Sequence, residues 1–269
     1  KVTLIDRRTQ LLRFLDQEIA QALDSQMLQN GVAIRLGQEH LSIVVNEAGR
    51  PAIQLHDGET VTADMLLYTM GRIGNTDALN LPAIGLSTDQ QGQLSVNSQY
   101  QTAIPHIYAT GDVIGFPALA ATAMEQGRLA ACHAFQVSES HDIKVIPYGI
   151  YSIPEVSMVG KTEEELAAAG VPHVAGRALF REMARGHISG ELHGLLKVVF
   201  HRDTHTLLGV HIIGQGATEL IHIGQSVLTY GGTVEYFVHN VFNYPTMAEC
   251  YRTAALDGLN RLHRQSPPP

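Results

Sequence analysis

Thr102-Ala-Ile-Pro-His-Ile-Tyr-Ala-Thr-Gly-Asp112 is the most informative stretch of this 269-residue chain. In it a short apolar run ends at Gly111 and is followed at once by Asp112. An unpaired carboxylate is costly inside a sheet, so the pattern predicts a buried strand that stops before Gly111 and leaves Asp112 at the carboxyl edge. Cofactors of α/β proteins bind at that edge. A carboxylate there can accept hydrogen bonds from sugar or ribityl hydroxyl groups.

The residues beyond Asp112 distinguish two interpretations. A Gly-Asp pair after a strand is also an ordinary turn, and the dipeptide alone favours that simpler interpretation. Gly115 and Pro117 follow, however, and then a helix-like run from Leu119 to Phe135. The complete pattern of strand, loop and helix favours a cofactor-binding edge over a turn.

The first part of the chain alternates between strand and helix patterns. This order, with a helix that stops at Gly31, predicts a parallel sheet. Two of the apolar runs flank Asn46-Glu-Ala-Gly49 and predict an antiparallel hairpin inserted into the parallel part. The predicted strands are Val2–Ile5 (expected to be buried), Val32–Arg35, Leu41–Val45, Ala52–His56 and Met65–Thr69, and the predicted helix is Asp16–Asn30.

The final part of the chain combines strands and helices in separate runs. Thr162-Glu-Glu-Glu165 is a capping box and predicts a short helix after it. Leu195–Phe200 and Leu207–Ile213 predict a hairpin across the polar turn between them. Helices are predicted over Glu219–Tyr230 and near Arg252–His263. Strands followed by helices are typical of an α+β domain.

Composition and charge exclude several classes of function. The net charge of −8 disfavours a sequence-independent nucleic-acid surface. No stretch approaches the roughly 20 apolar residues of a membrane-spanning helix. Cys132 and Cys250 are the two cysteines and lack the C-x-x-C spacing, which indicates a reducing cytoplasm and no disulfide framework. The fourteen His residues form no recognisable metal-binding motif, so no metal site is predicted.

Several stretches together resemble the FAD-containing pyridine nucleotide–disulfide oxidoreductases. The stretch that ends at Asp112 is similar to the second flavin fingerprint of that family, T…YAxGD. The other motifs stand in the family's order and spacing, and the resemblance runs from Lys1 to about Arg264. They are Val2-Thr-Leu-Ile-Asp-Arg-Arg8, Leu67-Tyr-Thr-Met-Gly-Arg-Ile-Gly-Asn-Thr76, Gly149-Ile-Tyr-Ser-Ile-Pro-Glu155 and Phe242-Asn-Tyr-Pro-Thr-Met-Ala-Glu249.

The resemblance implies an order of domains. Residues 1–72 would be a partial NAD(P)-binding domain, 73–145 the C-terminal segment of the FAD-binding domain, 146–264 the dimerisation domain and 265–269 a disordered tail. The fold class is then α/β, with truncated Rossmann-like segments, followed by an α+β dimerisation domain. The family's two G-x-G-x-x-G phosphate loops do not occur in this sequence, so we expect the chain to be the C-terminal part of a longer polypeptide.

Asp6, Arg7 and Arg8 are the candidate residues for nucleotide selection. In a dinucleotide fold, an acidic residue at this strand end binds the ribose 2′-hydroxyl of NAD, and an arginine can pair with the 2′-phosphate of NADP. Both types are needed to tolerate both nucleotides, because a carboxylate repels the phosphate unless a guanidinium neutralises it. The sequence does not decide between Arg7 and Arg8, and a polar turn is the alternative. Gly71 would let the backbone pass close to a bound nucleotide, or it forms a simple crossover turn.

Four residues around the fingerprint are the candidate FAD contacts. The resemblance places the ribityl–pyrophosphate region of FAD at Asp112, with Gly111 removing side-chain bulk beside it. Leu119 and Ala120 open the next predicted helix, and their amides would face the pyrimidine edge of the flavin, because the first N–H groups of a helix lack internal partners. Ordinary packing at a helix start is the alternative for these two residues.

Tyr244 and Glu249 are the candidate catalytic residues. The disulfide reductases of the family carry His-Pro-Thr-x-x-Glu here. Their His relays protons to a thiol, is oriented by the Glu and reaches the flavin of the other subunit. In this chain Tyr244 replaces the His, and a phenol with a reference pKa of about 10 is a poor proton relay at neutral pH. Packing at a subunit interface is the alternative.

The resemblance implies a FAD-dependent oxidoreductase that transfers hydride between NAD(H) and NADP(H) through the flavin. It also implies a homodimer or higher homo-oligomer. The charge, the lack of a long apolar stretch and the cysteine spacing predict a cytoplasmic protein without nucleic-acid or membrane partners. A dihydrolipoyl dehydrogenase or another flavin disulfide reductase is the rival enzyme, which the replacement at Tyr244 disfavours. The third interpretation is a non-catalytic dimerisation fragment, which would bind FAD weakly or not at all.

Overall fold

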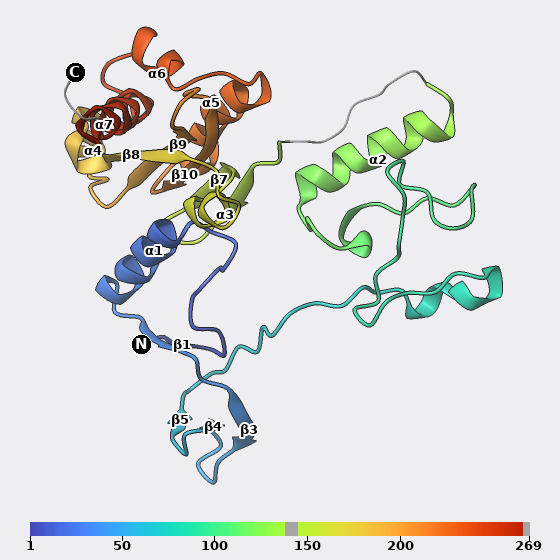
Figure 1. Ribbon diagram of the computed structural model, residues 1–269. Helices are drawn as coiled ribbons and strands as arrows, with labels where there is room; N and C mark the ends of the chain where they lie inside the picture. The colour runs from blue at the N-terminus through green and yellow to red at the C-terminus, as the bar shows by residue number, and fades with distance from the viewer. Residues whose placement is uncertain (138–144, 266–269) are drawn as a thin grey trace. The chain divides into compact units, whose positions relative to one another are not determined.

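The structure, a computed structural model, describes residues 1–137 and 145–265 (Figure 1). The chain divides into two compact units, and each has a hydrophobic core of its own. The first unit combines Lys1–Leu66 with Lys144–Pro269, and the second unit is Leu67–Ile143. The domain boundaries at residues 72 and 145 that the sequence suggests stay predictions.

A five-stranded antiparallel sheet forms the centre of the first unit. The predicted hairpin of its two longest central strands is confirmed, with Leu195 opposite Ile213 and Phe200 opposite Leu207. In spatial order the strands are β6 (Tyr148–Ile150), β7 (Val156–Gly160), β10 (Leu207–Ile213), β9 (Leu195–His201) and β8 (His173–Leu179).

Helices α5 (Ala217–Thr229) and α7 (Glu249–Gln265) pack on one face of this sheet. Successive side chains of a strand point to opposite faces, so Leu196, Val198 and Phe200 of β9 all enter the core that these helices complete. Each is fully buried, and burial of such a side chain stabilises the fold by roughly 1.5–3 kcal/mol.

Close packing against β8 determines one residue of this face. A Cβ atom on Gly176 would lie 1.9 Å from the carbonyl oxygen of Ala254 in α7. Glycine alone fits this approach, and it allows the helix to lie directly on the strand. Three shorter elements surround this side of the unit: α4 (Ala184–Ser189), α6 (Glu235–His239) and the 3-10 helix η4 (Phe180–Glu182).

Helix α1 (Gln17–Gln29) and helix α3 (Glu163–Ala168) lie on the opposite face. Ile19 and Leu23 of α1 belong to the same apolar cluster as Leu195, and Val199 packs in a cluster with α3. On β9, Lys197 lies between Leu195 and Val199, two positions from each, and therefore points to the same face. The sheet is thus covered on both sides.

Residues 1–62 also carry two smaller sheets. The predicted parallel pair and the predicted hairpin are confirmed, and a third hairpin strand, β5, extends them. The expectation that the first strand is buried is wrong, because among the described residues β2 is its single neighbour, and its side chains are half-buried or exposed. The strands are β1 (Thr3–Asp6) beside β2 (Ala33–Leu36), and β3 (His40–Val45), β4 (Pro51–Leu55) and β5 (Thr60–Thr62).

The second unit contains one long helix, α2 (Ala120–Ala134), close to the predicted run from Leu119 to Phe135. Its short 3-10 helices are η1 (Asp77–Leu79), η2 (Leu81–Ile84) and η3 (Gly111–Ile114). A small cluster of apolar residues holds it together: Leu81, Leu86, Leu94 and Ala109.

Two predicted strands are not found among the described residues. Met65–Thr69 has no strand pairing, and Met65 and Leu67 are exposed. The apolar run before Gly111 makes one isolated bridge, between Tyr108 and Gln101, and is otherwise unpaired. A strand requires a hydrogen-bonded neighbour, and an apolar run in the sequence does not state whether that neighbour is present.

Local signals predicted the helix ends more accurately. Asp16 caps α1 by accepting a hydrogen bond from the amide of Glu18 (3.1 Å). Thr162 and Glu165 form the predicted capping box, with both hydrogen bonds at 3.2 Å. Helix α7 ends at Gln265, so the first residue of the predicted tail is helical, and residues 266–269 lie outside the described residues.

Candidate cofactor site

The carboxylate of Asp6 turns back onto the residues that follow β1. Its Oδ1 accepts a hydrogen bond from the amide of Arg8 (2.8 Å), and Nη1 of Arg8 lies 3.7 Å from Oδ2. The carbonyl of Arg8 accepts a hydrogen bond from the amide of Gly37, just beyond β2 (2.8 Å). The structure therefore brings Asp6 and Arg8 together at the carboxyl edge of the parallel pair, and Arg7 is exposed beside them.

Arg72 and Asp112 form an ion pair in the second unit. Nη1 of Arg72 lies 3.7 Å from Oδ2 of Asp112, and both side chains are exposed. Gly71 precedes this arginine with a φ of 122°, a conformation that L side chains rarely adopt. The sequence argument identified Gly71 and Asp112 but not Arg72, whose place directly after the glycine was the available signal.

Gly111 connects the Asp112 loop to α2. It is buried, its φ is 77°, and its amide donates a hydrogen bond to Oε1 of Gln126 (2.7 Å). A Cβ atom at this position would lie 3.2 Å from the Cβ of Ala123. A side chain here is therefore strained by the backbone and crowded by α2. Gln126 was not predicted from the sequence, although a buried glutamine on a helix signals a required hydrogen bond.

Helix α2 begins at Ala120, and Leu119 is its N-cap in an extended conformation. The amide of Leu119 donates to the carbonyl of Pro117 (2.9 Å), so it is already paired inside the loop. Ala120 is exposed, and its amide belongs to the first turn of the helix, where N–H groups lack an intrahelical acceptor. The geometry favours Ala120 over Leu119 as a donor to a ligand.

The groups around Asp112 fit the chemistry of FAD. The exposed carboxylate is an acceptor for ribityl and ribose hydroxyl groups, and the Arg72 guanidinium offers positive charge to a phosphate. Gly111, which has no side chain, lets the Asp112 loop pack closely against Ala123 of α2. Phe116, in the loop before α2, exposes an aromatic ring. A hydrogen-bond acceptor, a positive charge and an apolar ring therefore occur in this unit, and a flavin nucleotide requires all three.

Glu249 is the first residue of α7, and Tyr244 lies in the loop before it. Glu249 Oε2 accepts a hydrogen bond from the amide of Thr246 (3.2 Å), and the Thr246 hydroxyl donates to the carbonyl of Asn243 (2.7 Å). The ring of Tyr244 is 74% exposed. Within residues 1–137 and 145–265, no hydrogen bond joins the two predicted residues. Glu249 therefore tightens the loop and starts the helix, and Tyr244 presents its phenol outward.

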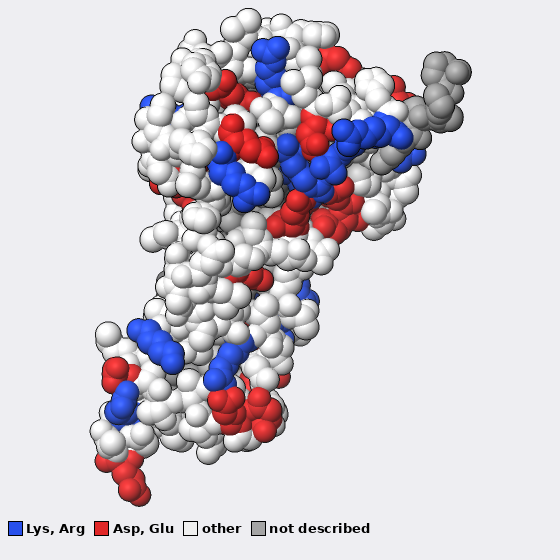
Figure 2. All heavy atoms as spheres, turned by 90° about the vertical axis from the view of Figure 1, so that its left-hand side faces the viewer, with Lys and Arg blue, Asp and Glu red and all other residues white. Residues whose placement is uncertain are grey.

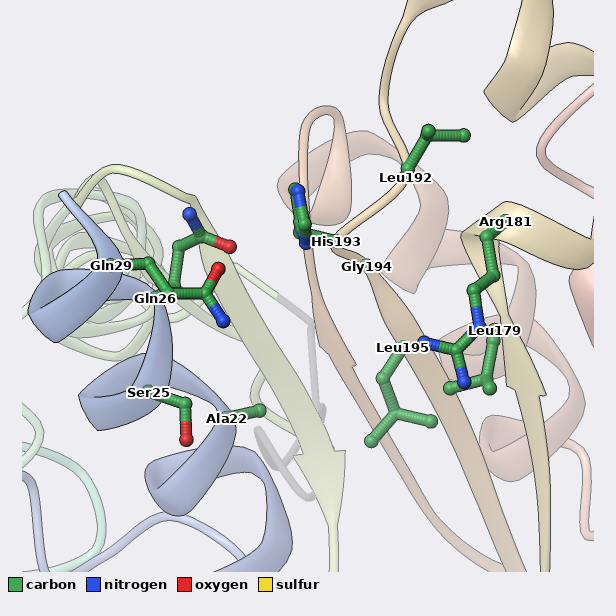
Figure 3. A pocket seen from close by; sticks show the side chains of 10 residues that line it. All are labelled: Ala22, Ser25, Gln26, Gln29, Leu179, Arg181, Leu192, His193, Gly194 and Leu195. Atoms are coloured by element: carbon green, nitrogen blue, oxygen red, sulfur yellow. The ribbon is translucent and has the colours of Figure 1, made fainter.

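A shallow groove of about 240 Å³ lies between α1 and the edge of β8 and β9 (Figure 3). In the close-up, Gln26 and Gln29 extend from the helix on one side, and Arg181 and His193 stand on the other. None of the site residues predicted from the sequence lines this groove.

Charges of both signs are interspersed on the surface. Figure 2 shows Lys and Arg side chains next to Asp and Glu side chains on the face that it presents. Arg261 lies 2.8 Å from Asp257, and Lys161 lies 3.5 Å from Glu165. In the described part of the chain, no three His, Cys, Asp or Glu side chains are grouped to hold a metal ion, and none of the helices is both long and apolar enough for a membrane span.

Two models of one protein family match most of the chain. Residues 1–127 match the pyridine nucleotide-disulphide oxidoreductase model, and residues 146–255 match the dimerisation domain of that family. The chain belongs to the pyridine nucleotide–disulfide oxidoreductases. The expected fold class, α/β segments followed by an α+β dimerisation domain, is confirmed.

Within this family, the chain is similar to proteins that carry one name. The chain is 54% identical to the soluble pyridine nucleotide transhydrogenase of Pectobacterium atrosepticum and 53% identical to that of Serratia proteamaculans, over 266 residues in both cases. Each match covers 97% of this chain and 57% of the relative. The chain thus spans little more than half the length of these relatives.

Solved structures agree on the fold. LpdA from Mycobacterium tuberculosis is 26% identical with a TM-score of 0.86, over 95% of this chain and 56% of that protein. The HOCl-induced flavoprotein disulfide reductase RclA from Escherichia coli has a TM-score of 0.89 over 95% of this chain and 59% of its own. At 22% identity, the second likeness supports the fold alone.

Proposed function

We propose that the protein transfers hydride between NAD(H) and NADP(H) through bound FAD. The observation that carries this proposal is the 54% identity, over nearly the whole chain, to a protein named soluble pyridine nucleotide transhydrogenase. Tyr244 supports it, because hydride exchange between two nicotinamides requires no proton relay to a thiol. The relatives are longer than this chain, so the proposal concerns the activity of the whole protein.

Asp112, Gly111, Leu119 and Ala120 hold FAD in this proposal. The Asp112 carboxylate accepts hydrogen bonds from the ribityl or ribose hydroxyl groups, and Gly111 lets the loop that carries it pack closely against α2. The amides at the start of α2 face the flavin ring, with Ala120 the stronger candidate because the Leu119 amide is already paired. When bound, FAD supplies the centre that accepts hydride from one nicotinamide and donates it to the other.

Asp6 and Arg8 distinguish the two nucleotides. With NAD, the Asp6 carboxylate accepts a hydrogen bond from the ribose 2′-hydroxyl. With NADP, the Arg8 guanidinium pairs with the 2′-phosphate and offsets the negative charge of Asp6. We assign this role to Arg8 because it is already tied to Asp6, whereas Arg7 is exposed without a contact to that carboxylate in the described structure. Gly71 allows close passage of the backbone near the nucleotide.

A homodimer completes the proposal. The segment 146–255 matches a dimerisation domain, and the exposed ring of Tyr244 lies within it. Tyr244 then faces the flavin site of the partner subunit, and Glu249 holds the loop that carries it. The curated relatives are named soluble, and the two cysteines lack a disulfide spacing; both support a cytoplasmic location.

The test is an assay with FAD-loaded protein that contains this chain. We expect NADPH to reduce thio-NAD, and we expect little turnover of lipoamide or glutathione disulfide with either nucleotide. The control is the same protein after removal of FAD, which should lose the transfer. Strong lipoamide reduction without transfer between nucleotides contradicts the proposal and favours a disulfide reductase.

The cysteines seen here do not favour that rival. Burial raises the pKa of the Cys250 thiol to about 12, so it is an inert core residue at neutral pH. Cys132 is on α2 and has no second cysteine near it in the sequence.

A further inference from the structure

Lys197 and Asp16 form a buried ion pair between the antiparallel sheet and α1. Nζ of Lys197 lies 2.7 and 2.9 Å from the two carboxylate oxygens of Asp16. The two side chains are 2% and 0% exposed. Lys197 is on β9, Asp16 is the N-cap of α1, and 181 positions of sequence separate them.

Three further charged side chains surround this pair. Oε2 of Glu18 lies 3.1 Å from Nζ of Lys197, and Nε of Arg177 donates a hydrogen bond to Oε1 of Glu18 (2.7 Å). Glu163 contacts both Lys197 and Arg177, the latter at 3.0 Å. The cluster therefore joins α1 and α3 to β8 and β9.

Both members of the pair are charged at neutral pH. Burial lowers the pKa of Lys197, but its hydrogen bonds with Asp16 and Glu163 outweigh burial and leave the pKa above its ordinary value. Burial raises the pKa of Asp16, but the interactions with His211 and Lys197 outweigh burial and leave that pKa below its ordinary value. The pair is therefore maintained as an ion pair rather than neutralised.

Stability alone gives little reason for such a pair. Replacement of a buried ion pair by apolar side chains is often neutral or stabilising by about 1–4 kcal/mol, whereas removal of one partner costs about 3–5 kcal/mol. What the pair does provide is geometry, because both charges are satisfied in the observed placement of α1 on the sheet.

That placement extends to the loop that carries Arg8. Residues 7–15 connect the end of β1 to Asp16. Near β1, the carbonyl of Arg8 is bonded to the amide of Gly37, and at the other end Leu15 is buried beside the ion pair. The far end of the loop is thus fixed by a residue of the antiparallel sheet.

We propose that Lys197 and Asp16 are positioning residues for nucleotide selection. By fixing the far end of the loop of residues 7–15, they restrict its motion and so keep the Arg8 guanidinium where the 2′-phosphate of NADP binds. Asp6 is held by strand pairing inside β1, so loss of the ion pair weakens NADP(H) more than NAD(H). This inference rests on the proposed function and adds the residues that set its nucleotide preference.

The test variant replaces both partners, D16N together with K197M. Asn is as good an N-cap as Asp, and Met has a side chain of similar length without the charge, so neither member of the pair is left as an uncompensated charge. The matched control is K161M, which removes an exposed lysine that pairs with Glu165 on the surface. Should the double variant not fold, D16N alone is used, because Lys197 then retains Glu18 and Glu163.

The first measurement needs no cofactor. Arg7, Arg8 and Arg13 are trypsin sites within or beside the loop. We expect cleavage at these sites to be about tenfold faster in the double variant and within about twofold of the unmodified chain in K161M, because local opening controls proteolysis. Unchanged cleavage in the double variant overturns the anchoring role.

The second measurement uses the FAD-loaded enzyme. We expect the KM for NADPH to rise about tenfold, the KM for NADH to stay within about twofold, and kcat at saturation to change little. A purely structural role would move both KM values together, and that result overturns the inference. If the unmodified enzyme shows no transfer between nucleotides, the proposed function fails, and the selection role fails with it whatever the trypsin result.

Discussion

The antiparallel sheet and the segment of residues 63–73 that follows β5 differ in how completely their apolar residues are covered. Leu196, Val198 and Phe200 of β9 are fully buried between the sheet and helices α5 and α7. In the segment of residues 63–73, Met65 and Leu67 are 88% and 86% exposed. Exposed apolar surface of this kind is typical of regions that bind a ligand or another part of a protein. Burial of the β9 side chains therefore stabilises the fold, whereas Met65 and Leu67 contribute little to its stability.

The largest expected effect tests the buried core of the antiparallel sheet. Phe180 is fully buried in the core of the sheet, so Phe180→Ala should lower the free energy of unfolding by about 3–5 kcal/mol. Urea unfolding followed by circular dichroism measures it.

The control for that loss of stability is a substitution in the exposed segment of residues 63–73. Leu67→Ala removes an exposed side chain and should change the unfolding free energy by no more than about 0.5 kcal/mol. Equal losses in the two variants would remove the distinction between the two regions.

A substitution at Arg8 tests the proposed selection between NAD(H) and NADP(H). Arg8→Ala should raise the KM for NADPH about tenfold, equivalent to about 1.4 kcal/mol, with the KM for NADH nearly unchanged. Arg7→Ala is the matched comparison and should have an effect below about twofold. Steady-state kinetics of the FAD-loaded enzyme decides, and a larger effect from Arg7 would reverse the assignment. Neither change should alter the unfolding transition.

The last expected effect is a pH dependence of stability, and it concerns His211, at the boundary between the sheet and α1. Its Nε2 donates to the carbonyl of Lys161 (2.9 Å), its Nδ1 is buried without a partner among the described residues, and burial lowers its pKa below 6.5. The unfolded chain then binds a proton that the folded chain does not, so stability falls as the pH drops below about 6.5, by at most about 1.4 kcal/mol per pH unit.

Unfolding measured at about pH 7.5 and pH 5.5 checks this, because Asp16 titrates below its ordinary value of 3.8 and contributes little in that range. His211→Gln keeps a donor for the Lys161 carbonyl and should flatten the decline. An equally steep decline in the variant would show that another group is responsible.

The contrast between local and distant interactions explains what the sequence could predict. The capping box at Thr162 joins residues three apart and was predicted, and the helix expected over Asp16–Asn30 lies within one residue of α1 at each end. The strand expected at Met65–Thr69 failed because pairing depends on a neighbour that the run itself does not specify. The ion pair of Lys197 and Asp16 joins residues 181 positions apart, and the sequence around either residue does not predict it.

The candidate site divides in the same way. Asp6 and Arg8 are near neighbours, so their association followed from the sequence, but the choice of Arg8 over Arg7 needed the observed hydrogen bond. Arg72 and Gln126 contact the Asp112 loop from distant positions and were found only in the structure.

Flavin retention by an Asp112→Ala variant tests the central claim most directly. The FAD content of the purified enzyme is measured by visible absorbance. Asp64→Ala is the control, because that carboxylate is 91% exposed and lies well before the fingerprint in the sequence. Loss of hydrogen bonds to a charged acceptor, worth about 1.5–3 kcal/mol, predicts a dissociation constant for FAD about ten to a hundred times higher. Undiminished flavin absorbance and turnover in Asp112→Ala would contradict the account.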